Sequence, residues 1–176
     1  MPRLQTFFSA PLLVLLLLSS TSCGYTRKTA LPRDIRTIHV DTFKNKINLG
    51  DVYAYEPGLE IKITNAVIRR LHLDGNLRVA SREEADVVLE GDLIGFDQEG
   101  VRFTGLERIE EYRLYVAVDI RLRDIKTGET LWNEDNFSGD SSYFVTGPRS
   151  VSRTIATDRA VEKLARNVVD RIVEDW

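Results

Sequence analysis

Cys23 is the residue whose side chain and position together indicate a covalent reaction, and it is the only cysteine in the chain. Arg3 precedes the nearly apolar run Phe7–Leu18, and the small residues Ser19–Ser22 lead from that run to the cysteine. This order of charge, apolar core and small residues is that of a secretory signal peptide. A thiol placed directly after it takes a thioether-linked diacylglycerol, and cleavage then frees an amine for a further acyl chain such as palmitate. We predict that residues 1–22 are removed and that Cys23 carries the lipid.

Two alternatives compete with this interpretation. The apolar run is shorter than the roughly 20 residues of a spanning helix, so it is not a stable anchor by itself. An ordinary signal peptide with an incidental cysteine is the other alternative, and Ser20 stands where a lipobox usually has leucine. A lone cysteine forms no intramolecular disulfide, however, which favours the lipid. Each buried methylene contributes about 0.8 kcal/mol, so two or three acyl chains hold firmly.

A second group of chemical interest is basic. Arg121, Arg123 and Lys126 lie at the end of a predicted strand and in the turn after it. Their side chains offer charge-assisted hydrogen bonds to phosphate, about twice as strong as neutral ones. We therefore predict them as contacts for a partner or for phosphate. The competing interpretation is that the two arginines only balance Asp119 and Asp124, and that the lysine is a plain turn residue.

Motifs of catalysis and of metal binding are missing from the sequence. His39 and His72 belong to different predicted elements and have no ligand at the spacing of a metal site. There is no GxSxG, no phosphate-cradling glycine loop and no HExxH. Neighbouring glutamates at 83–84 and 110–111 do not face one substrate, as paired catalytic carboxylates must. We predict a protein that is not an enzyme, with no catalytic residue, no metal and no cofactor.

Length and charge limit the remaining possibilities. The chain has 24 Lys+Arg against 27 Asp+Glu, a net charge of −3, which lacks the basic excess of a nucleic-acid-binding protein. Nothing after Leu18 is long and apolar enough to span a bilayer. We predict a lipidated flexible lead over 23–33 and a single domain over 34–176.

The clearest periodicity lies in Tyr112–Leu122, where every second residue is apolar and most of the others are polar or charged. Such alternation predicts a half-buried strand with one polar face. Lys126–Glu129 predicts a hairpin turn, with glycine supplying the positive φ. A return strand is expected over 130–138 and a loop over 138–150. That loop and the polar segment 44–55 are further candidates for partner contact.

The other elements follow from proline, glycine and helical spacing. A helix is expected to open at Glu56-Pro57-Gly58 and close at Asp74-Gly75-Asn76, and a final helix to start at Ser150 or Ser152 and reach Trp176. Strands are expected over 35–43, 77–80 and 87–96, with a helix packed on Gly91 and Gly95. This order predicts an α+β two-layer sandwich, with two helices on one face of a mainly antiparallel sheet of about four strands.

Several segments together resemble the LptE family of outer-membrane lipopolysaccharide-assembly lipoproteins. They are Cys23-Gly24-Tyr25, Leu31-Pro32, Ile35–Val40, Phe43-Lys44-Asn45, Ala85–Gly91, Glu111–Leu114 and Asp124–Trp132. Their order and spacing carry the resemblance, because a strand ending in Asp-x-x-Thr-Gly-Glu-x-Leu-Trp also occurs in other envelope lipoproteins.

The resemblance implies a non-catalytic outer-membrane lipoprotein that assembles with an LptD-type β-barrel and plugs its lumen. There, on the periplasmic side of the membrane or inside the barrel, it would help deliver lipopolysaccharide to the outer leaflet. Gly24 after the cysteine is consistent with sorting to the outer membrane. The family's lipopolysaccharide contacts are basic residues, and none is carried over to a position here. The rival hypothesis is an envelope adaptor that recruits or activates a periplasmic enzyme, for example one acting on peptidoglycan.

Overall fold

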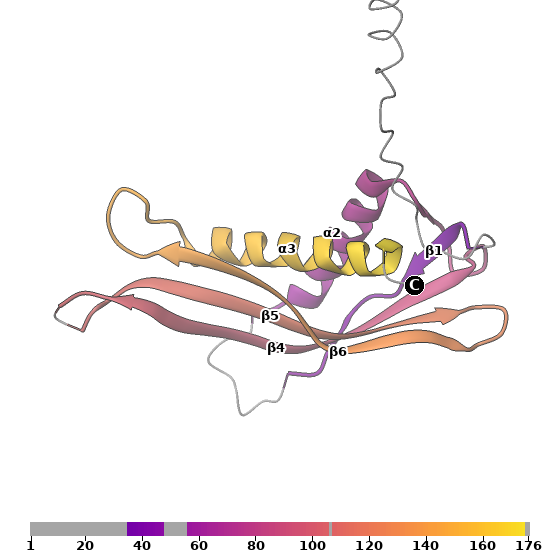
Figure 1. The fold of residues 1–176 in the computed structure, drawn as a ribbon, viewed down its shortest axis with the longest axis horizontal. Coiled ribbons are helices and arrows are strands. Elements are labelled where there is room, and N and C mark those ends of the chain that lie inside the picture. Colours follow the sequence, from indigo (N-terminus) through magenta and orange to yellow (C-terminus); the bar gives the residue numbers. More distant parts are fainter. Residues whose placement is uncertain (1–34, 48–55, 106, 175–176) are drawn as a thin grey trace, which may run out of the picture.

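Figure 1 shows a computed structural model in which two helices lie on the same side of one long sheet. It describes residues 35–47, 56–105 and 107–174. The elements are β1 (Thr37–Val40), β2 (Lys44–Asn45), α2 (Leu59–Asp74), β3 (Arg78–Val79), β4 (Val87–Phe103), β5 (Ile109–Asp124), β6 (Thr130–Phe144) and α3 (Arg153–Glu174). The predicted α+β class and the two helices on one face are therefore confirmed. Cys23, the leader and Trp176 lie outside the described residues.

Within the described residues the sheet is mixed and has six strands, so the prediction of about four mainly antiparallel strands was wrong in both respects. Its order is β3-β1-β4-β5-β6, with β2 pairing to β4. β1 runs parallel to both β3 and β4, and β2 runs parallel to β4. Parallel neighbours need a crossover connection, which α2 supplies between β1 and β3. Two-residue strands such as β2 and β3 are too short to show a periodicity in sequence.

The prediction for the central strand is confirmed. Leu114, Val116, Val118, Ile120 and Leu122 are buried along β5. The flanking strands are longer than the sequence indicated: β4 continues to Phe103 and β6 to Phe144. Register shifts interrupt the β4–β5 pairing after Leu93 and near the hairpin end, and the predicted loop from Ser138 is strand as far as Phe144. Such irregularities break strict alternation, which hid the outer parts of both strands.

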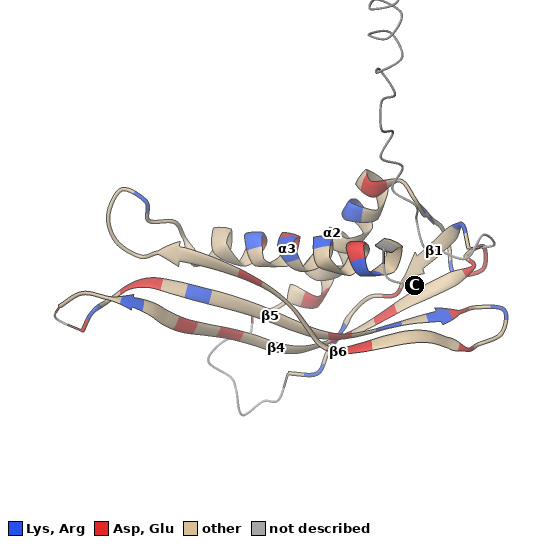
Figure 2. Cartoon of the chain, in the orientation of Figure 1, with Lys and Arg blue, Asp and Glu red and all other residues tan. Residues whose placement is uncertain are grey.

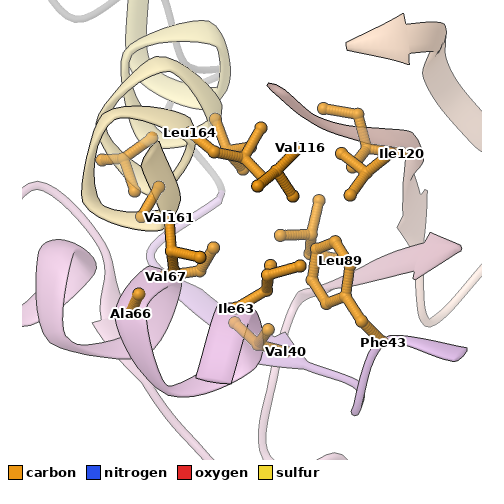
Figure 3. Packing of buried hydrophobic residues seen from close by; sticks show 14 of the residues in the cluster. Val40, Phe43, Ile63, Ala66, Val67, Leu89, Val116, Ile120, Val161 and Leu164 are labelled. Atoms are coloured by element: carbon orange, nitrogen blue, oxygen red, sulfur yellow. The ribbon is translucent and has the colours of Figure 1, made fainter. Parts of the chain in front are cut away.

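The core lies between the sheet and the two helices, with α2, α3, β4 and β5 all contributing apolar side chains (Figure 3). Phe43, from the segment after β1, lies across Gly91, where a Cβ would come within 2.2 Å of its ring. The prediction of a helix over Gly91 was therefore wrong. It is Gly139 on β6 that lies against a helix, because a Cβ there would be 2.5 Å from the backbone nitrogen of Leu164.

Both helices begin near the predicted signals, and α2 also ends at its predicted signal, whereas the predicted end of the last helix, Trp176, lies outside the described residues. Gly58 and Gly75 flank α2 in the left-handed conformation, with φ of 82° and 77°. The backbone N–H of Ile155 donates to Ser152 Oγ at 3.3 Å, so Ser152, rather than Ser150, caps α3. No helix among the described residues has the length and hydropathy to cross a bilayer.

The sheet is longer than its helical cover. The β4–β5 hairpin continues well past the N-terminal end of α3, and the loop after β6 lies at the same end (Figure 1). We call this the distal end of the sheet. The predicted basic residues Arg121, Arg123 and Lys126 lie nearer the opposite end of the sheet.

Candidate functional site

The predicted basic residues lie on the side of the sheet that faces away from the helices. We call this surface the charged face and define it by Glu90 and Asp92 of β4, Arg121 and Arg123 of β5, and Lys126 in the following turn. The cross-strand register places Glu90 opposite Arg121 and Val88 opposite Arg123. Figure 2 shows acidic and basic positions of both long strands side by side in this region.

Asp92 anchors the charged face. Its side chain is only 9% exposed, and one carboxylate oxygen accepts hydrogen bonds from Lys46 Nζ at 2.8 Å and Arg121 Nη2 at 3.0 Å. A buried carboxylate needs such partners because burial in an apolar setting otherwise penalises its charge. Arg121 is therefore committed to a carboxylate of its own chain.

Glu90 forms ion pairs with both arginines of the charged face. Arg123 Nη1 lies 3.2 Å from one of its oxygens, and Arg121 Nε lies 3.7 Å from the other. Arg123 also donates from Nη2 to the carbonyl of Gly128 at 3.2 Å. Arg121 and Arg123 thus share Glu90, and the structure brings these two predicted residues together.

Lys126 belongs to a separate pair with Asp86. Its Nζ lies 3.1 Å from Asp86 Oδ1, while Oδ2 accepts from the Arg36 N–H at 3.0 Å, the Thr37 N–H at 3.1 Å and the Thr37 hydroxyl at 2.8 Å. The backbone N–H of Arg36, followed by the Thr37 hydroxyl, holds the pKa of Asp86 far below its usual range. This carboxylate ties β1 to the start of β4.

Asp119 and Asp124, the acidic residues expected to balance the two arginines, accept backbone hydrogen bonds instead. Asp119 Oδ1 accepts the backbone N–H of Asn136 at 2.9 Å, at the irregularity of β6. Asp124 Oδ1 accepts the N–H groups of Lys126 and Thr127, each at 2.8 Å, and the Thr127 N–H is the main reason for its lowered pKa. The arginines are balanced, but by Glu90 and Asp92 instead.

The two histidines lie in different elements, in β1 and near the end of α2. His39 Nδ1 lies 3.0 Å from the carbonyl of Ala80, and its Nε2 lies 3.3 Å from Asp41. His72 is exposed near the end of α2. Among the described residues, no three His, Cys, Asp or Glu side chains are grouped closely enough to hold a metal ion.

The distal end holds a different basic arrangement, which the sequence analysis missed. The guanidinium of Arg149 lies 4.5 Å from the ring centre of Phe144, and that of Arg102 lies 5.5 Å from the same centre. We call Arg102, Phe144 and Arg149 the distal site. A pocket joins them, lined also by Glu110, Thr146, Gly147 and Pro148. Arg102 Nε pairs with Glu111 Oε2 at 3.1 Å, which engages one of the three nitrogens of its guanidinium group.

Apolar side chains are exposed beside this site. Four of the six exposed large hydrophobic residues in the described part of the chain belong to this end of the molecule: Val101, Phe103, Val145 and Ile155. Phe103, near the hairpin end of β4, is 57% exposed. The distal end therefore combines guanidinium groups with apolar surface, which suits an anionic amphiphile. The sequence signal was Val101-Arg102-Phe103, an arginine between two apolar residues.

A scan against family models matches residues 35–175 to LptE, described as lipopolysaccharide-assembly. No curated protein matches the sequence. Among solved structures, a hypothetical protein of Chlamydia trachomatis is 14% identical, covering 78% of this chain and 95% of its own at a TM-score of 0.51. A protein of Xanthomonas campestris is 16% identical, covering 81% and 84% at a TM-score of 0.50. These two likenesses concern the fold alone. The family match, which spans most of the chain, shows that this protein belongs to the LptE lipopolysaccharide-assembly family.

Proposed function

We propose that this protein is a non-catalytic, lipid-anchored subunit of the outer membrane that stands in the lumen of an LptD-type β-barrel and helps deliver lipopolysaccharide to the outer leaflet. The observation that carries the proposal is the family match over residues 35–175. The lumen of a large barrel is polar, so its occupant should present polar surface. The charged face suits this role because its arginines are already paired within the chain.

Within this proposal, lipopolysaccharide is held at the distal site. Its phosphates would meet the guanidinium groups of Arg102 and Arg149, which form charge-assisted hydrogen bonds to phosphate. Its acyl chains would meet the exposed Val101 and Phe103. Glu110 also lines the pocket and opposes an anion there, so the affinity depends on both arginines together.

The assembly role is tested by recovering partners from detergent-solubilised envelopes with the tagged, full-length protein. The expected result is co-purification of an outer-membrane β-barrel protein. Recovery of a peptidoglycan enzyme without a barrel would instead support an envelope adaptor and overturn the proposal.

Ligand contact is tested with matched double variants in which glutamine replaces arginine. Arg102→Gln with Arg149→Gln should weaken lipopolysaccharide binding about 100-fold, since a hydrogen bond to a charged group contributes roughly 1.5–3 kcal/mol. Arg121→Gln with Arg123→Gln removes the same charge from the charged face and should change binding less than about threefold. Equal losses in the two variants would show that total charge, and not the distal site, governs binding.

The anchor has its own test. Cys23→Ala should abolish labelling by a fatty-acid probe and the mass that lipid adds to the mature N-terminus. Cys23→Ser is the matched control for size, and it should give the same loss because a hydroxyl does not form the thioether. Labelling that persists in both variants would refute the lipid anchor.

A further inference from the structure

β6 is one edge of the sheet: it is the last strand in the sheet order and pairs along its length with β5, while Phe144 at its end also bridges to Ser150. An edge strand of this length presents a row of unpaired backbone groups and is a template for pairing with another chain. In a strand, the N–H and C=O of one residue point to the same side, and successive residues alternate. The residues whose backbone groups point away from β5 are thus the ones that another strand would meet.

Two contacts identify those residues. The carbonyl of Ser138 accepts the side-chain amide of Asn167 on α3 at 3.1 Å, and the carbonyl of Phe144 accepts the N–H of Val151 at 3.2 Å. Both carbonyls therefore point away from β5, as do the groups of Asp140 and Ser142 between them. The two ends of this row are occupied by the protein's own chain.

A stripe of three polar side chains on α3 contacts the β6 edge at Ser138 and on either side of it. Lys163, Asn167 and Arg171 are spaced four residues apart and so lie along one side of the helix. Lys163 pairs with Asp140, and Arg171 Nε donates to Glu134 Oε1 at 2.8 Å. All three side chains of the stripe reach β6, each at a different point along its length.

The backbone of β6 supports the same arrangement. Gly139 lets α3 lie directly on the strand, since a Cβ there would meet the Leu164 nitrogen. Asn136 has a φ of 55° and lies at a register shift, which interrupts the edge before Phe137. Bulges, charges and covering helices are the devices by which proteins blunt free edges.

We propose that the α3 stripe of Lys163, Asn167 and Arg171, together with the segment at Val151, closes the β6 edge against pairing with a second copy of this chain. Two identical edges meet readily in antiparallel fashion about a twofold axis, so a second copy is the partner that an opened edge would take. The proposed lipid anchor would add to this tendency by holding the copies on one membrane surface, but the closure itself rests on the contacts of β6 and α3. This inference does not depend on the proposed role in lipopolysaccharide delivery.

The test uses the full-length lipidated protein in an excess of detergent micelles. In the variant Lys163→Ala, Asn167→Leu, Arg171→Ala, amides of 138–144 should exchange with deuterium about tenfold faster, because the edge loses its contacts with α3 and opens locally more often. Native mass spectrometry should then show dimers whose fraction rises with protein concentration. The matched control is Arg159→Ala with Arg166→Ala, which changes exposed basic residues of the same helix, and it should behave like the wild type.

Wild-type exchange in the triple variant would overturn the proposal, and so would faster exchange without dimers. If the triple variant does not fold, as judged by circular dichroism, Asn167→Leu alone replaces it. That variant removes only the donor to Ser138 and keeps a similar volume. Its expected result is about threefold faster exchange at 138–142 with a detectable dimer, and exchange and mass equal to the wild type would refute the closure.

Discussion

The charged face and the distal site contain the same kind of residue in opposite circumstances. Arg121 lies across the strand pair from two carboxylates, and the more buried of these, Asp92, holds it at 3.0 Å. Arg149 has an aromatic ring at 4.5 Å as its neighbour, and the pocket around it is open. An arginine paired with a buried carboxylate stabilises the fold, whereas an arginine stacked on a ring keeps its donors for a ligand.

The comparison shows that a basic residue has to be judged by what the adjacent strand places opposite it. On the charged face, β4 supplies an acid for each arginine of β5. At the distal end, β6 supplies Phe144 opposite Glu111, and arginines from two segments, Arg102 and Arg149, lie over its ring. Under the proposed function, the first surface fits a neutral contact with a barrel and the second fits an anionic ligand.

The largest loss of stability is expected from a core substitution in β5, the strand that contributes residues both to the charged face and to the distal end. Val118 is fully buried, so Val118→Asp places an unpaired carboxylate in the core and should destabilise the fold by about 4 kcal/mol or more. Arg121→Ala, three residues along the strand, should cost about 1 kcal/mol because Asp92 keeps Lys46. Denaturant midpoints would measure the difference, and similar midpoints would refute the two-sided strand.

The central strand was predictable because burial on one side only imposes a period of two on the sequence. The caps of both helices were predictable for local reasons, since Gly75 and Ser152 act within one turn of the chain. The parallel strands β2 and β3 were not, because two residues carry no period and their pairing depends on a crossover. The packing of Phe43 on Gly91 is likewise a long-range contact that no local pattern records.

The second largest effect concerns the charged face itself. Reversing Arg121, Arg123 and Lys126 to glutamate sets three new carboxylates against Asp92, Glu90 and Asp86 and should destabilise the protein by about 3 kcal/mol. Replacing the same three residues by glutamine removes the attraction without adding repulsion and should cost less than half as much. Thermal unfolding would compare the two variants. Equal stability would mean that these ion pairs do not form in solution.

The candidate site was predicted only in part, and the reason lies in sequence separation. The three basic residues of the charged face stand close together in the chain, so residue type and alternation were enough to single them out. Arg102 and Arg149 come from distant segments, and only the pairing of Glu111 with Phe144 brings them to one ring. Sequence also could not show that Glu90 and Asp92 neutralise the first group, because cross-strand register is not a local property.

A smaller effect is expected from Asp86, which secures the charged face to β1. Its pKa is lowered in the folded protein by the Arg36 N–H and the Thr37 hydroxyl, so the ionised form stabilises the fold at neutral pH. That contribution is present above the unfolded pKa of about 3.9 and is lost as the pH falls through the folded value. Asp86→Asn should cost about 1–2 kcal/mol at pH 7 and progressively less below about pH 4.

Stability measured against pH in the acid range checks this expectation. Asp135→Asn, at an exposed position of β6, is the matched control and should give a curve parallel to the wild type throughout. A constant difference between Asp86→Asn and the wild type from pH 7 to pH 3 would show that the carboxylate charge has no role.

The smallest effect is expected on ligand binding at the distal site, where the ring of Phe144 either positions the two arginines or serves only as apolar surface. If the ring of Phe144 holds the guanidinium groups of Arg102 and Arg149 in place, Phe144→Leu should weaken lipopolysaccharide binding about three- to tenfold, because an exposed cation–π contact contributes roughly 0.5–1 kcal/mol. Phe103→Leu is the matched control, since Phe103 is exposed at the same end and, among the described residues, no arginine lies over its ring. Phe144→Tyr keeps an aromatic face and should bind like the wild type. If both leucine variants lose affinity equally, the rings serve only as apolar surface, and the two regions then differ only in how fully carboxylates engage their arginines, since Glu111 meets Arg102 at Nε.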